Sequence, residues 1–117
     1  MKRVFIVDDS KQVRERLISL LSDYSEIRIV GQSGNGKEAM NVLNTQKPDT
    51  VILDIRLPGK NGFQLLREIK AAHPEITVIM STNYDFEHYR KQCMQMGADF
   101  FFNKTLEFEK VVDVLVK

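Results

Sequence analysis

Residues 4–9 of the chain read VFIVDD, four consecutive apolar residues followed at once by two acids. A continuous apolar run of this length is typical of a strand that is buried on both faces of a parallel sheet. Ser10 is the expected N-cap of a helix that follows, because the next apolar residues recur at helical spacing: Val13, Leu17, Leu20, Leu21 and Tyr24. The stretch therefore predicts one strand followed by one helix.

The same alternation of strand and helix recurs four more times along the chain. Further strands are predicted at residues 27–30, 50–53, 76–80 and 100–102. The helices between them are expected to end near Pro48, Pro74 and Gly97, and Asp85 is the expected N-cap of the fourth helix. Connections between parallel strands are right-handed in nearly all proteins, so five such units predict an α/β fold, a doubly wound (βα)5 sandwich around a five-stranded parallel sheet. We expect one domain over residues 1–117, with no output domain in this stretch.

Composition and charge narrow the class of function. Of the 117 residues, 43% are hydrophobic and 28% are charged, which is enough to bury a core and unlike a disordered chain. Seventeen Lys and Arg against sixteen Asp and Glu leave a net charge of +1, too little to attract a nucleic acid or an anionic membrane. A single cysteine, Cys93, excludes an intramolecular disulfide, and no apolar run approaches the ~20 residues that span a bilayer. We therefore expect a cytoplasmic protein that binds neither nucleic acid nor membrane directly.

Polar side chains gather where the predicted strands end, at the edge of the sheet where doubly wound folds bind ligands: Asp8, Asp9, Asp54, Ser81, Thr82 and Lys104. Taken alone, Asp9 could equally cap a helix, and Lys104 could be a solvated lysine. Three carboxylates that lie together repel one another unless a cation sits among them, and Mg²⁺ is the natural candidate. Carboxylates, a hydroxyl and an ammonium together indicate a site for a phosphoryl group.

With these residues in place, the chain resembles the receiver domain of two-component response regulators over its whole length. The matching features are the acidic pair after VFIV, Asp54 in VILDIRLPGKNG, Thr82 after VIMS, and Lys104 after GADFFFN. The resemblance implies a flavodoxin-like fold with the strand order 2-1-3-4-5. It also implies that Asp54 is the phosphoacceptor and that Thr82 and Lys104 contact the phosphoryl group. The Mg²⁺ ligands would be Asp8, Asp9, Asp54 and the backbone carbonyl of Arg56. Thr82 and Phe101 would be the switch residues.

The function implied by this resemblance is a phosphorylation-activated signalling switch. A sensor histidine kinase or a phosphotransfer protein would donate the phosphoryl group to Asp54 in a Mg²⁺-dependent reaction. The domain would phosphorylate and slowly dephosphorylate itself without being a turnover enzyme. The signal would be read on the face formed by the fourth helix, fifth strand and fifth helix, by a downstream protein or a missing output domain, with Tyr84 and Phe101 as the expected contacts.

Three positions distinguish this chain within the family pattern, one by departing from it and two by lying where the family varies. Thr105 stands where the family usually has a proline in a cis bond, so the loop after Lys104 is expected to run differently. Arg56 and Tyr84 occupy the two variable positions that flank the acceptor, where they influence how easily water reaches the acyl phosphate.

Two other functions remain open at this point. Residues 31–37, GQSGNGK, match the GxxxxGK pattern of a P-loop and would suit a small nucleotide hydrolase. Against that reading, Glu38 replaces the expected Ser or Thr, and Asn35 with Glu38 also predicts a helix capping box. The third possibility is a receiver-like binding module that is never phosphorylated, although none of its five expected site residues is lost.

Overall fold

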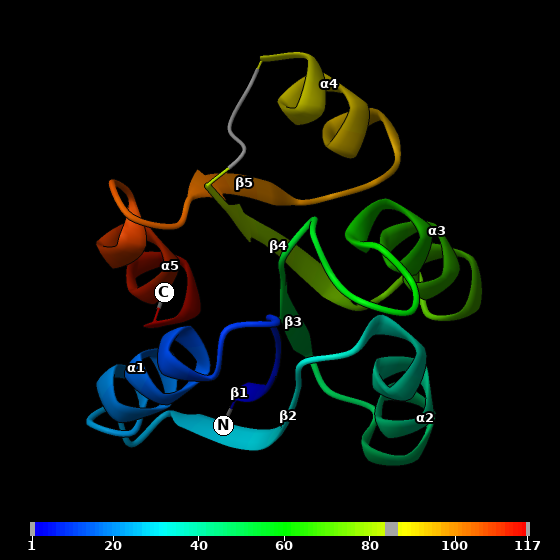
Figure 1. Ribbon diagram of the computed structural model, residues 1–117. Helices are drawn as coiled ribbons and strands as arrows, with labels where there is room; N and C mark the ends of the chain where they lie inside the picture. Colours follow the sequence, from blue (N-terminus) through cyan, green and yellow to red (C-terminus); the bar gives the residue numbers. More distant parts are fainter. Residues whose placement is uncertain (1, 84–86, 117) are drawn as a thin grey trace.

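The computed structural model describes residues 2–83 and 87–116. Five parallel strands form one sheet in the order β2-β1-β3-β4-β5, which confirms the predicted fold (Figure 1). The elements follow the expected alternation: β1 (Lys2–Val7), α1 (Lys11–Leu21), β2 (Ile27–Ser33), α2 (Gly36–Gln46), β3 (Thr50–Leu53), α3 (Gly62–Ala72), β4 (Thr77–Thr82), α4 (Glu87–Gln95), β5 (Phe100–Asn103) and α5 (Phe108–Val116). Among the described residues, no helix is both long and apolar enough to cross a membrane.

The sheet separates two apolar cores, one on each face. α1 and α5 cover one face, and α2, α3 and α4 cover the other (Figure 1). Along β1, Val4 and Ile6 belong to the first core, whereas Phe5 and Val7 belong to the second. All four side chains are buried, as predicted for a strand that is covered on both faces.

Four of the five strands extend beyond their apolar runs: β1 begins at Lys2, β5 ends at Asn103, and β2 and β4 continue further at their carboxyl ends. β2 continues through Ser33 because a bulge between the pairs Val4↔Ile29 and Phe5↔Gly31 keeps it paired with β1. β4 continues to Thr82, which pairs with Asn103 of β5. Thr82 therefore ends β4 instead of following it. The polar residues at the ends of β2 and β4 belong to the strands because of backbone pairing, which a pattern of apolar residues does not reveal.

The helices α1, α2 and α3 each begin at a polar N-cap residue, and two of these three caps were predicted. Ser10 caps α1 as expected, since its side chain accepts from the backbone N–H of Val13 (3.3 Å). Asn35 caps α2, but its own N–H donates to Ser33 Oγ (3.2 Å) and not to Glu38, so only half of the predicted capping box forms. α3 carries a complete box between Asn61 and Gln64 that was not predicted. The expected cap Asp85 lies outside the described residues.

The helices α2 and α3 begin at glycines that fit against the loop after β3. A Cβ atom on Gly36 would lie 1.8 Å from the carbonyl oxygen of Lys60, and one on Gly62 would lie 2.1 Å from that of Asp54. Real Cβ contacts essentially never fall below 3.0 Å. The N–H of Gly62 also donates to the Ile55 carbonyl (2.7 Å), so the start of α3 fixes the backbone directly after β3.

Replacing Gly62 with alanine is expected to destabilise the fold, because the added methyl group must displace the backbone of Asp54. We expect a loss of about 1–3 kcal/mol in the free energy of unfolding, as for other overpacked sites. Arg67→Ala is the control, since it changes an exposed residue of the same helix. Urea unfolding measures both, and equal stability of the two variants would contradict the close packing of Gly62.

Candidate functional site

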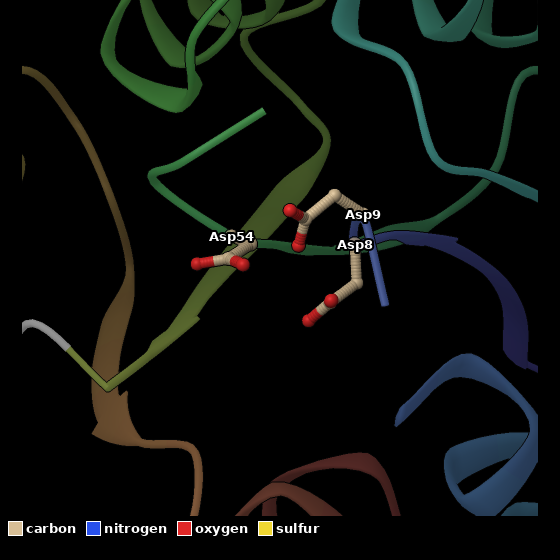
Figure 2. Close-up of side chains that lie close together, drawn as sticks. All are labelled: Asp8, Asp9 and Asp54. Atoms are coloured by element: carbon tan, nitrogen blue, oxygen red, sulfur yellow. The ribbon is translucent and has the colours of Figure 1, made fainter. Parts of the chain in front are cut away.

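The residues predicted to form a site do meet at one edge of the sheet. Asp8 and Asp9 directly follow β1, Asp54 follows β3, Thr82 ends β4, and Lys104 follows β5. Because the strands are parallel, all of these positions lie at the carboxyl edge. Figure 2 shows the side chains of Asp8 and Asp9 turned toward the side on which Asp54 lies.

The three carboxylates form one cluster. Asp8, Asp9 and Asp54 each place one oxygen so that all three oxygens lie within 4.8 Å of one another. Asp8 is 3% exposed and Asp54 is 4% exposed, whereas Asp9 is open to solvent. Two buried acids at this separation require a positive partner, because burial and mutual repulsion both disfavour their ionised forms.

Lys104 supplies that partner. Its Nζ lies 2.7 Å from Asp8 Oδ2 and 2.8 Å from Asp54 Oδ2, so one ammonium bridges both buried acids. Burial raises the pKa of Asp8, and the hydrogen bond from Lys104 opposes that rise only in part. Burial also acts to lower the pKa of Lys104, but hydrogen bonds to Asp54 and Asp8 outweigh it, so the net pKa is raised. The lysine therefore stays protonated between the two acids.

Backbone groups orient the two buried carboxylates. Asp54 Oδ1 accepts from the N–H of Ile55 (2.7 Å), and Asp8 Oδ1 accepts from the N–H of Ser10 (2.9 Å). The N–H of Asp54 itself donates to the carbonyl of Val7 (3.0 Å), which joins the end of β3 to the end of β1. Each acid thus has one oxygen held by the backbone and the other held by Lys104.

The donor set suits a divalent cation. Three carboxylates and one ammonium leave a formal charge of −2 (three negative groups, one positive). Carboxylate oxygens are the ligands that Mg²⁺ prefers, and the exposed Asp9 leaves the cluster accessible. Above it opens a pocket of about 300 Å³ that is lined by Asp9, Ser10, Val13, Asp54, Arg56, Asn83 and Lys104. Arg56 lines this pocket, and the role of its backbone carbonyl stays a prediction.

The two predicted switch residues are both buried. Thr82 is fully buried, and its carbonyl accepts from the N–H of Lys104 (2.9 Å). Phe101 is 2% exposed, and the guanidinium of Arg90 lies 4.8 Å from the centre of its ring. The Phe101 ring is therefore already turned inward in this conformation, and its roles as a switch residue and as a partner contact stay predictions. Tyr84, the other expected contact, lies outside the described residues.

Sequence reasoning missed the polar structure of the loop after β5. Asn103 Oδ1 accepts from the N–H groups of Thr105 (2.9 Å) and Leu106 (2.8 Å), an arrangement typical of Asn before a turn. The hydroxyl of Thr105 donates to Asn83 Oδ1 (3.0 Å) in the loop after β4. No cis peptide bond occurs among the described residues, so Lys104 and Thr105 are joined by a trans bond. The polar pair of Asn83 and Thr105 has no local sequence signal, since it joins residues 22 positions apart.

The P-loop alternative does not fit the structure. Residues 31–33 belong to β2 and not to a loop. Asn35 Oδ1 accepts hydrogen bonds from the backbone N–H groups of Lys37 (2.8 Å) and Glu38 (3.3 Å). A P-loop would need these N–H groups to bind the phosphates of a nucleotide. The glycines of the pattern are explained by close packing, such as that of Gly36 against Lys60.

Comparisons with known proteins agree with this geometry. Response regulator GacA of Pseudomonas viridiflava is 30% identical over 115 residues, covering 98% of this chain and 54% of that protein. The chain thus spans about half the length of GacA. Protein CcdB of Bacillus subtilis is 33% identical over 115 residues, covering 98% of this chain and 95% of that protein.

A solved structure agrees in its fold. The CheX-CheY-BeF3-Mg²⁺ complex from Borrelia burgdorferi contains a chain that superposes with a TM-score of 0.90 at 29% identity, covering 96% of this chain and 84% of that one. Residues 4–116 match the family described as response regulator receiver domain. The chain therefore belongs to the receiver domains of two-component response regulators, which are phosphorylation-activated signalling domains.

Proposed function

We propose that Asp54 is the phosphoacceptor of this receiver domain. The observation that carries the proposal is the bridge from Lys104 Nζ to both Asp54 and Asp8, at 2.8 and 2.7 Å. It holds a buried carboxylate beside a fixed positive charge, at the mouth of a pocket of about 300 Å³. A fixed ammonium beside an attacking carboxylate stabilises the charge that develops on a transferring phosphoryl group.

In the proposed reaction, a phosphohistidine of a sensor histidine kinase or phosphotransfer protein is the donor. A carboxylate oxygen of Asp54 attacks the phosphorus, the new O–P bond forms as the N–P bond breaks, and the imidazole leaves with the electron pair of that bond. Lys104 remains protonated and offsets charge on the phosphoryl oxygens. Hydrolysis of the acyl phosphate by water later restores the Asp54 carboxylate, so the domain acts as a timed switch and not as a turnover enzyme.

Asp8, Asp9 and Asp54, with the backbone carbonyl of Arg56, are the proposed ligands of Mg²⁺. When bound, the ion neutralises negative charge on the acids and on the incoming phosphoryl oxygens. The similar Borrelia burgdorferi complex contains Mg²⁺ together with BeF3, which supports the proposal that this receiver domain binds the same ion. Asp9 is the exposed member of the cluster, so the ion would enter and leave the site on the side of Asp9.

Phosphorylation is proposed to change the face formed by α4, β5 and α5. The new group would carry a charge of about −1.5 to −2 beside Thr82 and Lys104. Lys104 is joined to Thr82 by a backbone hydrogen bond, so movement at either residue reaches the ends of β4 and β5. The hydroxyl of Thr82 would turn to the phosphoryl group, and Phe101 would respond as the packing beneath it changes.

The signal is proposed to pass to a downstream protein or to an output domain joined to this receiver. Both arrangements have a parallel among the relatives, since the match covers 95% of CcdB but 54% of GacA. We propose that residues 1–117 form the receiver unit and make no direct contact with nucleic acid or membrane. A receiver-like module that is never phosphorylated is the alternative that the following experiment tests.

Incubation with acetyl phosphate and Mg²⁺ is expected to add one phosphoryl group, detected by intact mass spectrometry. Asp54→Ala should abolish the added mass, because it removes the attacking oxygen. Asp113→Ala is the matched control, an exposed acid on α5, and it should retain full uptake. Uptake by Asp54→Ala equal to that of the control would show that the acceptor lies elsewhere, and no uptake by the unmodified chain would favour a non-phosphorylated module.

Mg²⁺ is expected to raise the melting temperature, because a ligand that binds only the folded state stabilises it. At ten times the Kd the gain is about 1.4 kcal/mol. Asp9→Asn should remove most of the rise while still folding, since Asp9 is exposed, and Asp113→Asn should keep it. A thermal melt series in MgCl2 measures the effect. Stabilisation that requires ATP and is lost in Lys37→Ala would instead support a nucleotide hydrolase.

A further inference from the structure

Asn83 is an uncharged polar side chain at the wall of the phosphoryl pocket. It directly follows Thr82 at the end of β4 and lines the same pocket as Asp54 and Lys104. An amide differs from the acids around it because it carries two N–H donors and no charge. It can therefore approach a phosphoryl oxygen without repelling it.

The amide of Asn83 is held in place from the opposite loop. Thr105 Oγ1 donates to Asn83 Oδ1 at 3.0 Å, and the N–H of Thr105 is itself held by Asn103 Oδ1 at 2.9 Å. The backbone bond from Lys104 N–H to the Thr82 carbonyl (2.9 Å) runs beside this pair. Two loops are thus joined at adjacent positions, once through backbone and once through side chains.

This arrangement leaves the donors of the amide for another partner. The bond from Thr105 uses the carbonyl oxygen of Asn83, so the two N–H donors on Nδ2 are not consumed by it. Lys104, which lines the same pocket, already directs its ammonium to Asp8 and Asp54. A neutral donor fixed at the rim would complement this ammonium around a phosphoryl group carried by Asp54.

We propose that Asn83 is a further phosphoryl-binding residue whose amide donates to an oxygen of the phosphoryl group on Asp54, and that Thr105 is its positioning residue. The inference rests on the proposed role of Asp54. In the reaction with acetyl phosphate, the Asp54 O–P bond forms, the bond between phosphorus and the acetyl oxygen breaks, and acetate leaves. Asn83 takes no proton in this step and acts only by hydrogen bonding.

Substitutions at both positions separate this role from simple loop bracing. Asn83→Ala removes the donors, and Asn83→Asp keeps an acceptor for Thr105 but replaces the donors with a negative charge. Thr105→Val removes the orienting hydroxyl, and Thr105→Ser restores it. The matched control is Asn44→Ala, which removes an exposed amide of α2 that does not line this pocket. Asn44 Oδ1 lies 3.0 Å from Nε2 of His73, the C-cap of α3.

Two quantities are measured in the 117-residue chain: the rate of phosphorylation by acetyl phosphate, and the affinity for beryllofluoride followed by ¹⁹F NMR. A hydrogen bond to a charged group is worth roughly tenfold or more in an equilibrium, so we expect about a tenfold weaker beryllofluoride affinity in Asn83→Ala. Asn83→Asp should lose more, Thr105→Val should lose part, and Thr105→Ser should regain it. Asn44→Ala should match the unmodified chain.

The outcomes distinguish this inference from the proposed function. If the unmodified chain takes up no phosphoryl group, the role of Asp54 fails and this inference fails with it. If the unmodified chain is phosphorylated and both Asn83 variants match it in rate and affinity, only the inference is overturned. It is also overturned if Asn83→Ala and Asn83→Asp lose affinity equally and lose Mg²⁺ affinity and melting temperature in step, because that pattern indicates loop bracing alone.

Discussion

The ammonium of Lys104 is the group on which the rest of the site depends. Two acids that are almost fully buried, Asp8 and Asp54, each place an oxygen within 2.8 Å of its Nζ. A buried charge without a partner costs several kcal/mol, and two such charges side by side cost more. The fold must therefore bring the residue after β5 to the ends of β1 and β3. The strand order 2-1-3-4-5 with all strands parallel achieves this, because it places the carboxyl ends of β1, β3, β4 and β5 at one edge.

The loops that surround the acids are held by backbone contacts more than by side chains. Gly62 packs against the carbonyl of Asp54, and Gly36 packs against the carbonyl of Lys60. These contacts join the starts of α2 and α3 to the loop that begins at Asp54, the proposed acceptor. On the other side, Lys104 and Thr105 join the loop after β5 to the end of β4. Asp54 thus lies between a tightly packed loop and a pair of loops that are joined by hydrogen bonds.

Local patterns predicted most of the fold and the charged part of the site. Apolar runs that end in acids marked β1 and β3, so the meeting of Asp8, Asp9 and Asp54 followed from parallel topology alone. The extension of β2 to Ser33 was not predictable, because it depends on a bulge in its pairing with β1. The inward position of Phe101 and the bond between Asn83 and Thr105 depend on the packing of distant segments, which neither periodicity nor spacing reports.

The most direct test of the account is a double-mutant cycle between Lys104→Met and Asp54→Asn, measured as the free energy of unfolding in urea without Mg²⁺. If Lys104 balances the buried acids, Lys104→Met destabilises the chain strongly, and much of that loss disappears when Asp54 is already neutral. The account predicts a coupling energy of about 1–3 kcal/mol between the two positions. A coupling energy near zero, or a Lys104→Met variant as stable as the unmodified chain, would contradict it.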